Sequence, residues 1–258
     1  MIPVFNFIIS TYAFFALIGS LSAAIFLFFR MERFDIDFGT LIFYIVFGVA
    51  GLLLGSRIMF VISRIPELIG NFSMSKLIMY IFNGGIVFYG GLFGVLTAIK
   101  VCAKIKKHNS RKMFNFFTLA FPLFHMWGRI GCFFGGCCYG KAWDWGFAMA
   151  FDPETVRIPV QLIESMCNII IFIVLMIYEA QSKNKYLSLL PVYLVLYSVC
   201  RFFLEFFRGD SERGLWGVLS TSQVIALIVL LCCFVFRLRE KMRARKIKDD
   251  YDSDLQLL

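Results

Sequence analysis

The chain has 258 residues, of which 60% are apolar and only 17% are charged. Soluble globular domains carry about 25% charged residues, and a soluble protein with the present composition would expose large apolar patches. Soluble, disordered and disulfide-scaffold classes are therefore excluded. The formal charge of +9 does not indicate a nucleic-acid partner, because most basic residues lie between or after long apolar runs, as the anchors of membrane spans do.

Seven apolar stretches approach the roughly 20 residues that a helix needs to cross a bilayer. The N-terminal stretch has neither a basic leader nor a small-residue cleavage site, so we expect a retained span there and not a signal peptide. The predicted fold class is an all-α, polytopic integral membrane bundle of about seven transmembrane helices. The predicted spans are 7–29, 41–62, 77–99, 114–134, 160–178, 187–207 and 220–236.

The distribution of lysine and arginine predicts the orientation of these spans. Basic residues concentrate in the connections after the first, third and fifth spans and in the tail that begins at Arg237. Because cytoplasmic connections carry the excess of lysine and arginine, we expect the N-terminus outside and the C-terminus in the cytoplasm. Residues 1–240 then form a single transmembrane domain, and residues 241–258 form a charged cytoplasmic tail.

Arg57, Arg129 and Arg201 lie inside predicted spans, where a guanidinium costs several kcal/mol unless something compensates its charge. Arg201 and Glu205 are four residues apart on one helix face and can pair directly. Structural salt bridges are one interpretation. However, Glu164 and Glu205 are the only acidic residues that we place in the spans, which leaves one positive charge over. The planar fork of arginine matches phosphate oxygens, so an anionic lipid head group is the favoured ligand.

Half of the 20 glycines fall in two short segments, 83–94 and 128–140. Glycine in a span permits close helix approach or irregular backbone that lines a cavity. Helix packing fits the first segment. The second segment predicts that the fourth span ends, after Arg129, in a loop.

Most of the eight cysteines fall in apolar helices, where cysteine usually acts as a small hydrophobe. Cys132, Cys137 and Cys138, together with His125, could in principle hold a soft metal ion, but they lack the usual C-x2-C pair. We therefore expect no metal and no cofactor. His125 itself fits a hydrogen-bonded core residue better than a catalytic base.

The segment 125–140, HMWGRIGCFFGGCCYG, resembles the signature of the bacterial prolipoprotein diacylglyceryl transferase family, in which Gly-Arg-hydrophobic-Gly-Asn-Phe is followed by Asn-Gly-Glu. The resemblance covers nearly the whole chain, and seven spans with an outside N-terminus are also the family's arrangement. The other similar positions are Tyr12 in the first span, Gly55-Ser-Arg57, Gly84-Gly-Ile-Val-Phe-Tyr89-Gly-Gly, Pro159-Val-Gln161-Leu-Ile-Glu164 and Arg201-Phe-Phe-Leu-Glu205-Phe-Phe-Arg208.

The resemblance implies a transferase of lipoprotein biosynthesis in the bacterial cytoplasmic (inner) membrane. It would move the diacylglyceryl group of phosphatidylglycerol to the thiol of the lipobox cysteine in a preprolipoprotein, without a metal or cofactor. Arg129 would bind the lipid head group and Arg201 would steady the leaving phosphate, with Glu205 orienting Arg201. The remaining residues that we expect in the substrate site on this resemblance are Tyr12, Arg57, Cys132, Cys137, Gly140, Gln161 and Glu164, although Gln161 and Glu164 could simply cap the fifth span.

The chain departs from the family at three positions, where Tyr89 replaces a histidine, Cys132 an asparagine and Cys137 a glutamate. A phenol has a pKa near 10 against about 6.5 for imidazole, so Tyr89 is a poor general base but a serviceable hydrogen-bond donor, and we expect it to take part in catalysis in that way. Either phosphate stabilisation dominates the reaction, or the chain uses another lipid or acceptor. The alternatives are a covalent role for Cys132 or Cys137, a thiol redox protein, and a phospholipid-binding or transport protein without turnover.

Overall fold

The computed structural model describes all residues except 1, 5, 6, 71, 72, 84–87, 182–187, 211–214, 217, 218, 257 and 258. Its α-helices are α1 (Thr11–Arg30), α2 (Phe38–Ser63), α3 (Ile65–Gly70), α4 (Met74–Asn83), α5 (Phe88–Ile105), α6 (Ser110–Thr118), α7 (Phe121–Phe134), α8 (Val160–Gln181), α9 (Leu189–Leu204) and α10 (Thr221–Gln256). Two short 3-10 helices are η1 (Glu32–Phe34) and η2 (Glu205–Phe207), and the strands are β1 (Ile2–Val4), β2 (Phe7–Ile9), β3 (Ala142–Met149), β4 (Asp152–Arg157), β5 (Leu215–Trp216) and β6 (Leu219–Ser220).

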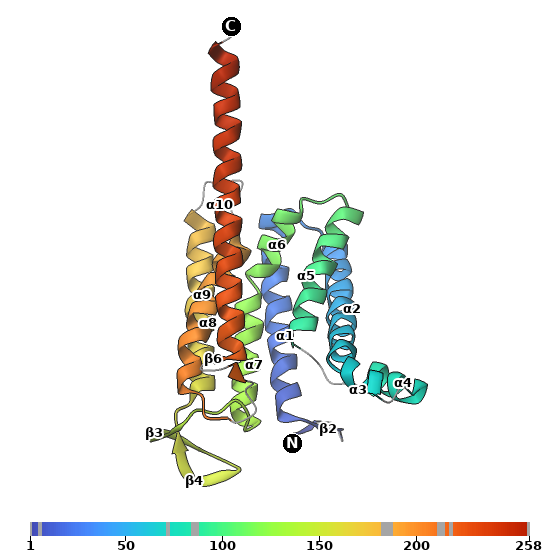
Figure 1. The fold of residues 1–258 in the computed structure, drawn as a ribbon, viewed down its shortest axis with the longest axis vertical. Coiled ribbons are helices and arrows are strands. Elements are labelled where there is room, and N and C mark those ends of the chain that lie inside the picture. Colours follow the sequence, from blue (N-terminus) through green and yellow to red (C-terminus); the bar gives the residue numbers. More distant parts are fainter. Residues whose placement is uncertain are drawn as a thin grey trace. The chain divides into compact units, whose positions relative to one another are not determined.

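The chain divides into two compact units. The first comprises Met1–Ala23 and Leu119–Leu258, and the second comprises Ala24–Thr118. In the first unit, α8 packs between α7 and α9, and α10 lies along α9 (Figure 1). A small buried cluster of Ile158, Val160 and Leu204 packs where α8 begins and α9 ends. This arrangement brings α7, α8 and α9 together around the candidate site.

Five helical segments of the described chain are long and apolar enough to cross a membrane, which confirms a mostly helical integral membrane protein. Two of the seven predicted spans are not single long helices. Span 77–99 falls on α4 and α5, and residues 84–87 between them lie outside the described residues. The five segments are Thr11–Arg30, Phe38–Ile62, Val160–Gln181, Leu189–Phe207 and Thr221–Met242.

The predicted span 114–134 is wrong as one continuous helix. It falls on α6 and α7, which are separated by a turn at Leu119 and Ala120. Pro122 stands at the start of α7, and proline has no backbone N–H with which to continue the hydrogen-bond ladder of a preceding helix. The break shortens α7 to 14 residues.

The described residues also include three two-stranded antiparallel sheets, which the all-α prediction missed. The largest, β3–β4, joins α7 to α8. A sequence signal was present, because Trp143, Trp145 and Phe147 alternate with other residues at the period of a strand. All three aromatic side chains are more than half exposed, and exposed tryptophan is typical of the membrane–water interface.

The predicted tail from residue 241 to residue 258 begins inside α10. Its backbone stays helical as far as Gln256. Many of its residues, including Arg243, Arg245 and Lys246, are good helix formers, which explains the extension of the helix beyond the apolar part.

In the second unit, α2 and α5 lie side by side (Figure 1) and touch through glycines. A Cβ atom on Gly55 would lie 2.2 Å from the carbonyl oxygen of Gly90, and one on Gly94 would lie 1.9 Å from that of Gly51. Each helix thus presents a Gly-x-x-x-Gly pair, the motif that lets membrane helices approach closely. This confirms that helix packing is the role of the glycines at positions 90 and 94.

We expect Gly94→Ala to destabilise the second unit by about 1–3 kcal/mol, because the added methyl overlaps backbone that only a helix shift can clear. The measurement is equilibrium unfolding in mixed detergent micelles. Gly48→Ala is the matched control, since it lies on α2 and nothing approaches its Cβ position within 4 Å. Equal stability of the two variants would contradict close packing at Gly94.

Candidate functional site

The end of α7 is closed by a Schellman motif, which turns the chain back over the helix. The N–H of Cys137 donates to the carbonyl of Cys132 at 3.1 Å, and the N–H of Gly136 donates to that of Phe133 at 3.2 Å. Gly136 has φ +72°, as the left-handed position of this cap requires. The expected loop after Arg129 is therefore present, and it begins at Gly135, the C-cap residue.

The chain after this turn is held by backbone pairing. Gly140 forms an antiparallel bridge with Arg208, and the N–H of Gly209 donates to the carbonyl of Tyr139 at 3.0 Å. A Cβ on Gly140 would lie 2.2 Å from the carbonyl oxygen of Ile158, so only glycine fits there. Gly140 thus allows three backbone segments to meet beside the candidate site.

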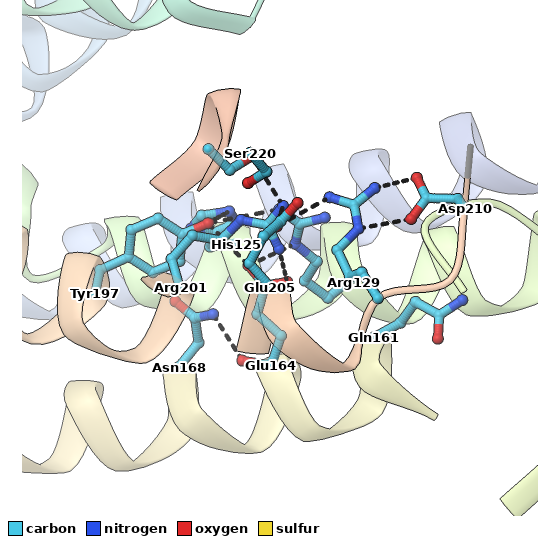
Figure 2. A network of polar contacts seen from close by, with 12 residues as sticks. His125, Arg129, Gln161, Glu164, Asn168, Tyr197, Arg201, Glu205, Asp210 and Ser220 are labelled. Carbon is cyan, nitrogen blue, oxygen red and sulfur yellow. Dashed lines mark hydrogen bonds and ion pairs between the residues drawn. The ribbon is translucent and has the colours of Figure 1, made fainter. Parts of the chain in front are cut away.

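Glu164 is the centre of the site and is 1% exposed. Its Oε1 atom lies 3.0 Å from Nε of Arg129 and accepts a hydrogen bond of 2.8 Å from the hydroxyl of Tyr197. Its Oε2 atom accepts one of 3.3 Å from Nη1 of Arg201. Figure 2 shows how side chains from three helices, α7, α8 and α9, converge on this network. Glu164 therefore holds the two predicted phosphate-binding arginines together instead of capping α8.

Arg201 also binds Glu205, with Nη2 2.7 Å from Oε2, which confirms the predicted pair. The same carboxylate lies 3.7 Å from Nη1 of Arg208. Arg208 in turn donates through Nε to Oδ1 of Asp210 at 2.8 Å and through Nη2 to Oδ2 of Asp210. The result is a continuous chain of buried ion pairs.

The network is balanced in charge, with three guanidiniums facing three carboxylates. The positive charge that the sequence analysis left over is therefore not found here, because Glu164 and Glu205 match Arg129 and Arg201, and Asp210 matches Arg208. The other intramembrane arginine, Arg57, belongs to the second unit. Its Nη1 atom is buried and has no hydrogen-bond partner among the described residues. Arg57 is thus the better place for an uncompensated charge.

The two arginines on Glu164 differ in the donors that they have left. In Arg201, Nη1 is bound to Glu164 and Nη2 to Glu205 and to the hydroxyl of Ser222 at 3.1 Å. In Arg129, the only contact of the Nη atoms within the described part of the chain is a long one of 3.5 Å to Tyr197. The Arg129 side chain is also 15% exposed, against 9% for Arg201. Arg129 therefore has the guanidinium edge that is open to a ligand.

His125 contacts the hydroxyl groups of two tyrosines in the network. Its Nε2 atom lies 3.3 Å from the hydroxyl of Tyr197 and its Nδ1 atom 3.1 Å from that of Tyr193. These contacts favour the hydrogen-bonded core residue over the catalytic base. Sequence analysis missed Tyr197 and Tyr193. Tyr193, Tyr197 and Arg201 follow one another at intervals of four residues, which places all three on one face of α9.

The remaining predicted site residues are placed unevenly. Tyr12, half exposed on α1, packs against Gly131, with 3.5 Å between its Cδ2 atom and the Cβ position of Gly131. Gln161 is buried and donates through Nε2 to the carbonyl of Cys137 at 2.8 Å, so it fixes the cysteine loop and does not cap α8. The side chain of Tyr89 lies outside the described residues, which leaves its catalytic role a prediction.

Comparison with known proteins identifies relatives of this chain. A family model described as "Prolipoprotein diacylglyceryl transferase" matches residues 1–239. The phosphatidylglycerol–prolipoprotein diacylglyceryl transferase of Clostridium tetani is 31% identical over 202 residues, which cover 75% of this chain and 78% of that protein. The proteins of the same name from Clostridium perfringens, number 2, and from Acinetobacter baumannii are 29% and 30% identical over 200 and 202 residues. These matches cover 75% and 74% of this chain and 76% and 72% of those proteins, respectively.

Proposed function

The chain belongs to the prolipoprotein diacylglyceryl transferase family, and from this premise we propose that it transfers diacylglyceryl from phosphatidylglycerol to a cysteine thiol in a prolipoprotein. The acceptor is the lipobox cysteine. The setting is the outer side of a bacterial inner membrane, with seven passes of the chain, an outside N-terminus and a cytoplasmic C-terminus. We place the binding of the lipid phosphate and the transfer reaction where α7, α8 and α9 meet.

The observation that carries the proposal is the open guanidinium edge of Arg129 beside a second arginine. A phosphodiester bound to the Nη atoms of Arg129 would receive charge-assisted hydrogen bonds. Arg201, whose donors are already engaged, acts by its charge and by holding Glu164. As the carbon–oxygen bond breaks, the leaving phosphate gains negative charge, and two nearby cations stabilise that charge more than they stabilise the bound lipid.

The reaction is a displacement in which the acceptor sulfur forms a bond to the glycerol carbon that bears the phosphate. The bond from that carbon to the phosphate oxygen breaks, and glycerol phosphate leaves with the electron pair. The thiol proton goes to solvent or to the departing phosphate. Tyr12, Gly140 and Gln161 are the further residues of the first unit that we propose to line or shape the substrate site, and the roles of Arg57 and Tyr89 in the second unit stay predictions.

The test is a transfer assay with the purified protein, phosphatidylglycerol labelled in its glycerol head group, and a lipobox peptide. We expect release of labelled glycerol phosphate and an equal amount of diacylglyceryl-modified peptide. The same peptide with serine in place of its cysteine is the control and should give neither product. Binding of the lipid without release of glycerol phosphate would contradict the proposal and favour a lipid-binding or transport protein.

A further inference from the structure

Three thiol groups that the reaction above does not use lie together at the end of α7. The Sγ atoms of Cys132, Cys137 and Cys138 are all within 4.8 Å of one another. Their spacing in the sequence argues against a metal site, but the Schellman motif brings the residue after the turn back over Cys132. Cys132 is buried, Cys138 is half-buried and Cys137 is exposed. The cluster is thus closed on one side and open on the other.

The backbone holds this cluster in place from two sides. Cys138 has φ +57°, a left-handed conformation that residues other than glycine adopt rarely. Gln161, itself 1% exposed, donates to the carbonyl of Cys137. Because the backbone is held at Cys137 and Cys138, the loop presents its thiols without the loss of conformational entropy that a mobile loop would undergo on binding.

Two cations, the guanidiniums of Arg129 and Arg208, lie near the thiol of Cys138. The thiolate is the form of cysteine that binds metals. Three thiolates around a divalent ion carry one net negative charge, which would lie close to these two guanidiniums.

We propose that Cys132, Cys137 and Cys138 bind a zinc ion and that the open fourth position of this ion takes the acceptor thiol. Zinc is bound by thiolates at about 2.3 Å in tetrahedral geometry, and catalytic sites keep one position free. Sulfur atoms in such a site are about 3.8 Å apart, so small side-chain rotations suffice to close the cluster on the ion. The second half of this inference rests on the proposed function.

Zinc would supply the deprotonation of the acceptor thiol that the proposed reaction needs. A thiol that binds zinc is deprotonated outright, and its proton passes to water. The zinc-bound sulfur then attacks the glycerol carbon, the carbon–oxygen bond to phosphate breaks, and glycerol phosphate leaves. The product is a neutral thioether, which is a weak zinc ligand and dissociates. Cys132 follows Arg129 by one turn of α7, so the thiolate and the bound phosphate would lie side by side.

The first test is titration of the purified, metal-free protein with Cd²⁺, whose thiolate complexes absorb in the ultraviolet. We expect one ion per chain, and an affinity at least about tenfold lower in Cys137→Ser and Cys138→Ser, since each removes one of three ligands. Cys232→Ser, an exposed cysteine of α10, is the matched control and should bind normally. Lack of the absorption band in the wild type, or an unchanged band in the two serine variants at equal thermal stability, would overturn the site.

The second test adds the lipobox peptide to the Cd²⁺-loaded protein. The cysteine peptide should increase the thiolate absorption, while its serine form should not; an equal response to both would overturn the acceptor-thiol role. If the metal-free protein catalyses transfer and zinc does not raise the rate, the inference would be overturned but the proposed function would stay intact. Conversely, zinc and thiol binding without any release of glycerol phosphate would contradict the proposed function alone.

Discussion

Replacement of Arg129 by lysine is expected to lower the rate of diacylglyceryl transfer by at least about 100-fold, equivalent to about 2.7 kcal/mol of transition-state stabilisation. Lysine keeps the positive charge and can still pair with Glu164, but it loses the planar pair of Nη donors that remains open in Arg129. The measurement is kcat and KM for release of glycerol phosphate. Because the open donors meet the developing charge on the phosphate, we expect most of the loss in kcat.

Arg157→Lys is the matched control for this experiment. Arg157 pairs with Asp152 at 2.7 Å in the β3–β4 hairpin, and a partly exposed pair of this kind contributes little to stability. Its variant should retain activity within about twofold, since it alters no contact of the arginine network. Wild-type turnover by Arg129→Lys would remove Arg129 from the mechanism, whatever the stability of the variant.

The long apolar helices and one ion pair of the site were predictable from the sequence. Apolar length predicted α1, α2, α8, α9 and α10, because a bilayer imposes a minimum length on a spanning helix. The spacing of Arg201 and Glu205 predicted their ion pair, because residues four apart share a helix face. Both predictions depend only on residues close together in the sequence, so the packing of the helices does not change them.

The non-local part of the site was not predictable from spacing. Glu164 binds both arginines because α7, α8 and α9 pack together, and no sequence period encodes that packing. Asp210 was missed for a similar reason, and Arg208 was named only as part of a motif. They lie at the end of a predicted span, where the chain leaves the helix and pairs with the segment around Gly140.

The cysteine cluster shows how a turn changes the interpretation of a spacing. Motif rules for metal sites assume the common turns between ligands. Here the left-handed glycine at position 136 closes a Schellman cap, which places Cys137 over Cys132 at a separation in sequence that the usual motifs do not contain. The glycine-rich composition of the segment indicated a broken helix but not the direction in which the chain returns.

Glu164→Gln is expected to have the largest effect on both stability and activity. Glutamine has nearly the same size as glutamate, but it cannot neutralise Arg129 and Arg201, which would remain buried with one carboxylate fewer. Removal of one partner from a buried ion pair destabilises a protein by about 3–5 kcal/mol. We expect a lower free energy of unfolding in mixed micelles of that order, and turnover below about 1% of wild type because Arg129 loses the contact that orients it.

Glu154→Gln separates this effect from a general loss of negative charge. Glu154 is exposed on β4, so its variant should unfold and turn over as the wild type does. The unfolding curve and the activity of Glu164→Gln also answer different questions. Normal stability with lost turnover would show that Glu164 serves catalysis through Arg129 alone. Normal turnover would contradict its position at the centre of the site, because the lipid phosphate would then be held without the carboxylate that joins the two arginines.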